Sequence, residues 1–173
     1  MEAIVITDAM KILRRIALLA SAIACFWVAV ACSHEVSQAD MQAGNGLLQM
    51  PSQFTVAETG DRLEALLQER GLTLMARIDH AQNAASVDQE LRDTQLLIFG
   101  NPAVGTPLMQ CNQTVAIDLP QKALIWQDDG EEVWLAYNDP EYLMERHDLA
   151  GCEPVIERIG QALNGLAMAA TQP

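Results

Sequence analysis

The segment from residue 100 to 107, Gly-Asn-Pro-Ala-Val-Gly-Thr-Pro, holds the residue types that most directly indicate chemistry. Thr106 and Pro107 are typical of the N-cap and first residue of a helix, so the spacing predicts a helix from Pro107 to about Gln113. The free N–H groups at such a helix start favour an anion. The sequence therefore predicts a site for a small anionic or polar ligand, formed by Gly100, Asn101, Gly105 and Thr106.

The same segment has the glycine spacing of a phosphate-binding P-loop but not its lysine, which would stand between Gly105 and Thr106. Without that cation, triphosphate binding and phosphoryl transfer are not expected. A simpler alternative stays open, in which the glycines and prolines of this segment only shape a tight connection.

The neighbouring residues Asp79 and His80 form a second candidate site, at the end of an expected strand. A histidine beside a carboxylate can act as a general base or a ligand. An alternative function is therefore an enzyme that uses His80 as its base and the loop of residues 100–106 as its anion site, which requires the two to lie within about 8 Å. Adjacent strand residues point to opposite faces, however, and Asp79 could simply cap the following turn.

The sequence shows no spacing typical of a Ser-His-Asp set or of a metal site, so binding is favoured over catalysis and no cofactor is expected. Cys111 and Cys152 are the two cysteines of the expected domain. A disulfide between them would close a loop of about 41 residues and add roughly 4 kcal/mol of stability. The alternative is two separate buried thiols, and His147 near Cys152 lacks the spacing of a zinc ligand.

Several segments with clear periodicity must position these residues. A capping box at Thr55–Glu58 and a stop at Gly71 predict a helix over 56–70. Alternation predicts a strand over 72–78 whose buried face holds Leu72, Leu74, Ala76 and Ile78. The apolar residues 96–99 predict a central strand that is covered on both faces or meets a partner subunit.

The remaining segments complete an α+β fold. Residues 122–127 and 132–138 predict a hairpin that turns at 128–130. An edge strand over 47–50, a short helix or loop over 81–90 and helices that start near Pro140 and Pro154 account for most of the rest. The late hairpin argues against a parallel sheet. We therefore expect a two-layer sandwich over residues 47–171, with a mostly antiparallel sheet and helices on one face.

The first 31 residues resemble a secretory signal, in which basic residues precede an uncharged stretch over 16–31. Met10 is an alternative start of the signal. Cys32 follows directly, where a lipoprotein signal places its lipid-modified cysteine, and residues 32–46 read as a polar tether. We expect an exported, periplasmic protein whose contact with a membrane is a lipid anchor at Cys32 in the outer membrane. The alternatives are ordinary cleavage before Cys32 and a retained N-terminal membrane anchor.

The excess of acidic residues indicates which classes of partner the chain is not expected to bind. The chain has 173 residues, with 10 Lys and Arg against 23 Asp and Glu, for a formal net charge of −13. Nucleic acids and anionic membranes attract basic surfaces, so neither is expected as a general partner. Trp126 and Trp134 are accordingly interpreted as core or subunit-interface residues. A third hypothesis is a structural interaction protein that pairs into a homodimer through residues 96–99.

The chain also resembles the domain of unknown function 302 family. The resemblance rests on residues 76–80 (Ala-Arg-Ile-Asp-His), 97–109, 117–120 and 137–143, and its most specific element is Gly-Asn-Pro-x-x-Gly-Thr at 100–106. It extends from about Leu47 to Ala169 and implies a compact, often dimeric α+β domain. It implies no catalytic residues, so it adds no mechanism.

Overall fold

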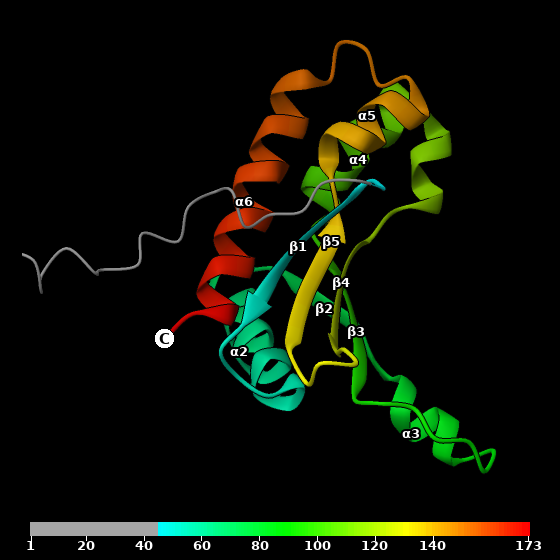
Figure 1. The fold of residues 1–173 in the computed structure, drawn as a ribbon. Coiled ribbons are helices and arrows are strands. Elements are labelled where there is room, and N and C mark those ends of the chain that lie inside the picture. The colour runs from blue at the N-terminus through cyan, green and yellow to red at the C-terminus, as the bar shows by residue number, and fades with distance from the viewer. Residues whose placement is uncertain (1–44) are drawn as a thin grey trace, which may run out of the picture. The chain divides into compact units, whose positions relative to one another are not determined.

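The computed structural model describes residues 45–173, so the expected signal peptide, Cys32 and nearly all of the tether lie outside the described residues. Five strands and five α-helices follow one another along this region (Figure 1). They are β1 (Leu47–Ser52), α2 (Val56–Glu69), β2 (Thr73–Asp79), α3 (His80–Ala85), β3 (Thr94–Gly100), α4 (Pro102–Cys111), β4 (Gln121–Gln127), β5 (Val133–Asn138), α5 (Pro140–His147) and α6 (Glu153–Thr171). A 3₁₀ helix, η2 (Gln113–Ile117), lies between α4 and β4.

The strands form one antiparallel sheet in the order β1-β5-β4-β3-β2. Helices α2 and α6 contact each other and pack along one face of this sheet (Figure 1). The expected α+β class is therefore confirmed. The expected hairpin is also confirmed, because β4 and β5 pair and turn between Gln127 and Val133.

Helix α2 has the ends that its sequence predicted. The hydroxyl of Thr55 accepts a hydrogen bond from the N–H of Glu58, while the Glu58 carboxylate accepts from the N–H of Thr55. This reciprocal pair satisfies two donors that the helix start leaves free. After the helix, Gly71 takes a left-handed conformation with φ of +68°, which a glycine adopts without steric cost.

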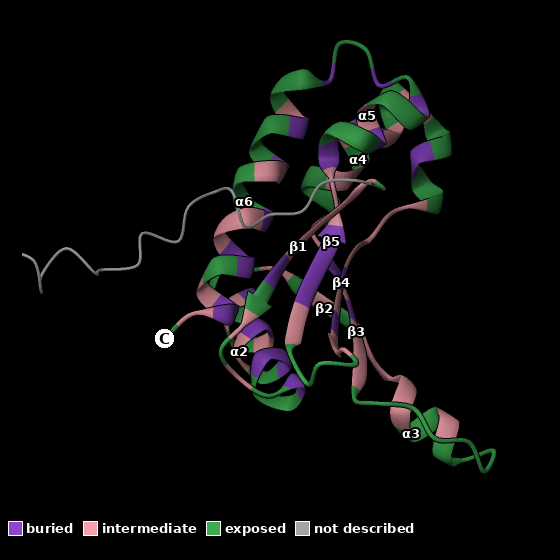
Figure 2. Cartoon of the chain, in the orientation of Figure 1, coloured by how far each residue is buried: buried purple, intermediate pink, exposed green. Residues whose placement is uncertain are grey.

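The hydrophobic core lies between the sheet and the two long helices. Figure 2 shows buried positions along α2, α6 and the strands that they cover. The largest fully buried side chains include Leu63, Leu67, Leu97, Ile125, Leu135 and Leu166. Since each apolar side chain of this size contributes about 1.5–3 kcal/mol when it is buried, this layer supplies most of the driving force for folding.

The predicted buried face of β2 is wrong for its second half. The pairing of β2 with β3 shifts between Leu74 and Ala76, so Met75 is an extra residue in the ladder. A bulge of this kind moves all following side chains to the opposite face. Arg77, expected to face solvent, instead faces α2 and bonds to the carboxylates of Asp61 and Glu64.

The other face of the sheet is apolar, and α2 and α6 do not cover it. On β3, Leu97 and Phe99 are buried toward the helices, whereas Leu96 and Ile98 are half-buried on this outer face. Their neighbours in register include Leu124 on β4, where Trp126 also stacks beside Trp134 of β5 with ring centres 6.5 Å apart. Within residues 45–173, β3 is thus an interior strand with one fully covered face.

Candidate functional site

Helix α4 begins five residues earlier than the sequence predicted. It starts at Pro102, and its N-cap is Asn101, so Thr106 and Pro107 lie inside the helix. Asn-Pro at 101–102 and Thr-Pro at 106–107 are both valid helix starts, and the first of them is used. The loop expected to bind a ligand is therefore mostly the first turn and a half of a helix.

The N–H groups needed for an anion site are already bonded. The side-chain oxygen of Asn101 accepts from the N–H of Ala103 at 2.9 Å. The main-chain oxygen of Asn101 accepts from the N–H groups of Val104 and Gly105 at 2.9 and 3.0 Å. Since these donors have partners, the predicted capture of an anion by the amides of this turn is wrong.

A pocket nevertheless lies beside this segment. It has a volume of about 510 Å³ and is bounded by α4, α6 and the adjoining ends of β3 and β4. All four predicted ligand residues (Gly100, Asn101, Gly105 and Thr106) line it. The wall is nonetheless predominantly apolar, with Phe99, Met109, Leu119, Ile159, Leu163 and Leu166 among its members. The pocket suits an apolar molecule better than a phosphate or a sugar.

Two polar side chains stand out in this wall. Gln121 is the first residue of β4 and pairs with Phe99 of β3. Its side-chain oxygen is buried and has no hydrogen-bond partner in the described chain. Arg158, on the exposed side of α6, is the only charged residue among those described that lines the pocket. The sequence pattern singled out neither residue, because both are brought to the pocket by tertiary packing.

The structure does not bring His80 to this pocket. Asp79 pairs with Gln95 at one end of β3, whereas Gly100 lies at the other end of that strand. At about 3.3 Å per residue, about 17 Å separates Gln95 from Gly100. Within one chain, His80 therefore cannot share a substrate with residues 100–106. Asp79 instead caps α3, because its carboxylate accepts from the N–H of Gln82 at 2.9 Å.

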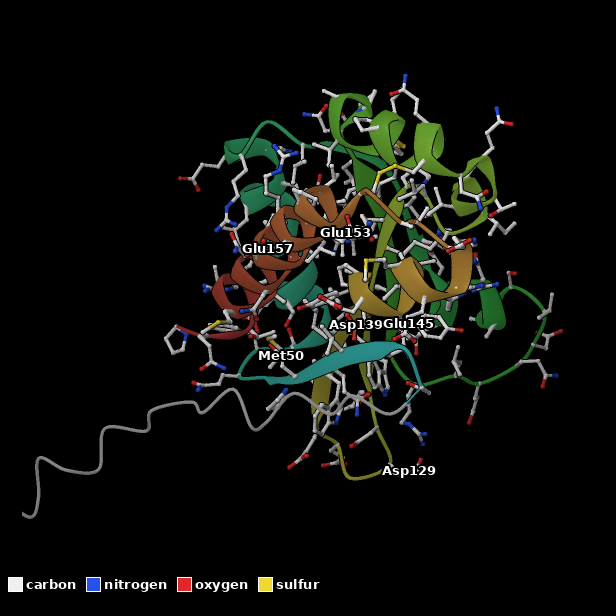
Figure 3. All side chains as sticks on the ribbon, turned by 90° about the horizontal axis from the view of Figure 1, so that it is seen from above. Met50, Asp129, Asp139, Glu145, Glu153 and Glu157 are labelled. Atoms are coloured by element: carbon white, nitrogen blue, oxygen red, sulfur yellow. A yellow bond between two sulfur atoms is a disulfide. The ribbon has the colours of Figure 1, made fainter. Side chains whose placement is uncertain are left out.

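Cys111 and Cys152 form a disulfide, with their Cα atoms 6.6 Å apart (Figure 3). Cys111 is the last residue of α4, and Cys152 is the N-cap of α6. The bond therefore joins the end of α4 to the start of α6, two helices that line the pocket. No cluster of three potential metal ligands occurs among residues 45–173.

A second polar cluster, which the sequence spacing did not reveal, surrounds His147. Its Nε2 lies 2.6 Å from a carboxylate oxygen of Asp118, and its Nδ1 lies 3.0 Å from the hydroxyl of Thr114. The hydroxyl of Thr114 also donates to Asn112, whose side-chain N–H donates to the His147 carbonyl at 2.7 Å. The order of these groups resembles a hydroxyl–imidazole–carboxylate triad. Here, however, the bonds join Thr114 and Asp118 of the η2 segment to His147 at the end of α5. The cluster fastens η2 to α5.

Comparison with known proteins identifies the domain. The family model described as "Domain of unknown function DUF302" matches residues 48–166. The chain belongs to this family. The crystal structure of an uncharacterized conserved DUF302 protein from Bacillus stearothermophilus superimposes with a TM-score of 0.66 and 16% sequence identity, over 73% of this chain and 99% of that one. The likeness supports the DUF302 fold, and the resemblance predicted from the sequence is confirmed.

Closer sequence relatives of this DUF302 chain are larger proteins. It is 43% identical over 105 residues to "Fluoride-specific ion channel FluC 1" of Brucella suis biovar 1 and to "Fluoride-specific ion channel FluC 2" of Brucella melitensis biotype 1. The match covers 61% of this chain but only 41% and 39% of those relatives. Among the described residues, none of the helices has the length and apolar character required to cross a bilayer.

Proposed function

We propose that this DUF302 protein is an exported accessory domain that binds a small, mainly apolar ligand in the pocket between α4 and α6. The predominantly apolar wall of this pocket is the observation that carries the proposal. Such a wall stabilises an apolar molecule by removing it from water. The pocket volume of about 510 Å³ also lies in the usual range for small-molecule sites.

Substitution at the pocket wall tests this proposal with a dye. Ala162 is an exposed residue of α6 that lines the pocket, so Ala162→Trp places an indole in the opening without a change inside the core. Gln161 is exposed on the same helix but outside the pocket, and Gln161→Trp is the matched control. The fluorescent probe ANS, whose emission increases when it binds to an apolar site, is titrated into the native protein and each folded variant.

We expect ANS to bind the native protein and Gln161→Trp equally, and Ala162→Trp at least tenfold more weakly. Equal binding by the two tryptophan variants would place the dye elsewhere, on the outer face of the sheet for example. That result, or an absence of binding to the native protein, would overturn the pocket proposal.

The accessory role and the location have separate support. In the Brucella relatives the matched stretch is a minor part of a protein named as a fluoride channel, so a sequence of this kind does occur joined to a membrane protein. The signal-like residues before Cys32 and the disulfide both fit an oxidising compartment. Intact mass spectrometry of the protein from its host membrane tests the anchor, since a lipid-modified Cys32 adds the mass of its acyl chains. An unprocessed N-terminus would argue against a lipid anchor at Cys32.

Self-association is a second proposal, based on the outer face of the sheet. This face holds Leu96, Ile98, Leu124 and the two stacked tryptophans. A second copy that covers it would remove this apolar surface from water. Sedimentation equilibrium of the native protein should show a dimer. A monomer at every concentration would count against the proposal.

A further inference from the structure

We infer that the ligand is an amphiphilic anion, with an apolar chain inside the pocket and a carboxylate-type head group held by Arg158 at its opening. This inference rests on the function proposed above and names the chemical class of the ligand. Three observations carry it. The other cationic side chains of the described region are bonded elsewhere, the pocket wall includes no described acidic residue, and that wall is mainly apolar.

The first observation concerns the seven cationic side chains of the described region. Six of them bond to carboxylates or to main-chain oxygens outside their own helix or strand: Arg62, Arg70, Arg77, Arg92, Lys122 and Arg146. Arg158 differs, because its Nε donates only to the carbonyl of Pro154, one turn earlier in α6. In a chain with a formal net charge of −13, the guanidinium whose bonding among the described residues stays within its own helix is the one at the pocket.

The second observation is that the lining of the pocket includes no described Asp or Glu. An anionic head group therefore meets no like charge in the wall and has Arg158 beside it. A cationic head group would meet the same guanidinium and no carboxylate. Because the energy of a charge pair depends on its sign, the opening selects for a negative group.

The third observation is the apolar wall, which indicates the chemistry of the part of the ligand that lies inside the pocket. Helix α6 contributes Val155, Ile159, Leu163 and Leu166 to the wall, and the other sides add Leu72, Phe99, Met109 and Leu119. Such a wall stabilises a hydrocarbon chain by removing it from water. It offers few partners for the hydroxyls of a sugar. An aliphatic monocarboxylate fits both the wall and the opening.

Two probes with hydrocarbon chains of nearly equal length and head groups of opposite charge test this inference. Decanoate and decyltrimethylammonium are used to displace ANS from the native protein, from Arg158→Gln and from the control Arg92→Gln. Arg92 is an exposed arginine outside the pocket, paired with Asp129, so its removal alters net charge equally. We expect decanoate to displace the dye from the native protein and from Arg92→Gln. Arg158→Gln should weaken decanoate about fivefold and leave decyltrimethylammonium no weaker.

The outcomes separate the two proposals. Equal displacement by both probes, or an equal loss in the two arginine variants, would overturn the anionic head group while the pocket proposal stands. The Ala162→Trp comparison shows whether the dye binds in the pocket. If it does and neither probe displaces it, the inference that the ligand has an aliphatic chain is overturned. If the dye does not bind in the pocket at all, the proposed function fails first.

Discussion

The carboxylate of Asp128 organises the turn of the β4–β5 hairpin. It accepts hydrogen bonds from the N–H groups of Gly130 and Glu132 and from the indole N–H of Trp134, at 2.8, 2.9 and 2.8 Å. The bond from Trp134 is the largest cause that holds the pKa of Asp128 below its ordinary value of 3.8. A residue outside the pocket thereby gives the protein an acid-sensitive element.

Asp128→Asn should therefore make the free energy of unfolding fall less steeply as the pH is lowered into the acid range. Because the pKa of Asp128 is lowered in the folded state, its contribution is complete well above pH 3.8 and is lost as the pH falls through the folded value. Urea unfolding of the native protein and the variant at a series of pH values from 6 to 2 measures this effect, with pH steps of about 0.5. An acid limb of the same slope in both proteins would contradict the assignment.

At the scale of elements, local signals predicted α2 correctly and placed α4 wrongly. The start and stop of α2 depend on residues within a few positions of each end, Thr55, Glu58 and Gly71, so the sequence alone was sufficient. For α4, two start signals compete, and the sequence does not show which one packing selects. The bulge at Met75 also escaped prediction, since the register of a strand depends on its partner.

The helical environment of Gly105 predicts opposite effects for two glycine substitutions. A Cβ at Gly105 would lie in ordinary contact, 3.8 Å from Leu119, so Gly105→Ala should raise the free energy of unfolding by about 0.5–1 kcal/mol. Gly151 has open space around it but a φ of +87°, so Gly151→Ala should lower that free energy by about 1–2 kcal/mol. Denaturant unfolding of both variants is the measurement. A destabilised Gly105→Ala would show that this position needs glycine for a reason other than helix geometry.

For the molecule as a whole, the sequence predicted the α+β class and one stretch of the pocket wall. Residues 100–106 were selected for a chemistry that their bonded N–H groups do not support, although the pocket does lie beside them. The residues that give the pocket its polarity, Gln121 and Arg158, come from a strand start and a helix surface without any local pattern. His147 and Asp118 likewise meet only in three dimensions.

The disulfide should contribute both to stability and to the pocket. Closure of a loop with a sequence separation of 41 residues stabilises the fold by about 4 kcal/mol in the chain-entropy model. Since Cys111 is the last residue of α4 and Cys152 is the N-cap of α6, both of which line the pocket, reduction should also weaken ANS binding. Thermal unfolding and ANS titration with and without reductant measure the two effects. An unchanged melting temperature would show that the bond is dispensable.

The same bond gives the polypeptide a covalent ring that spans both strands of the hairpin. The tip of this hairpin, around Gly130, is exposed and lies between the two cysteines in sequence. A protease that cuts at this tip would open the ring without releasing a fragment. The clipped protein should therefore migrate as one band on a denaturing gel run without thiol and as two bands once thiol is added.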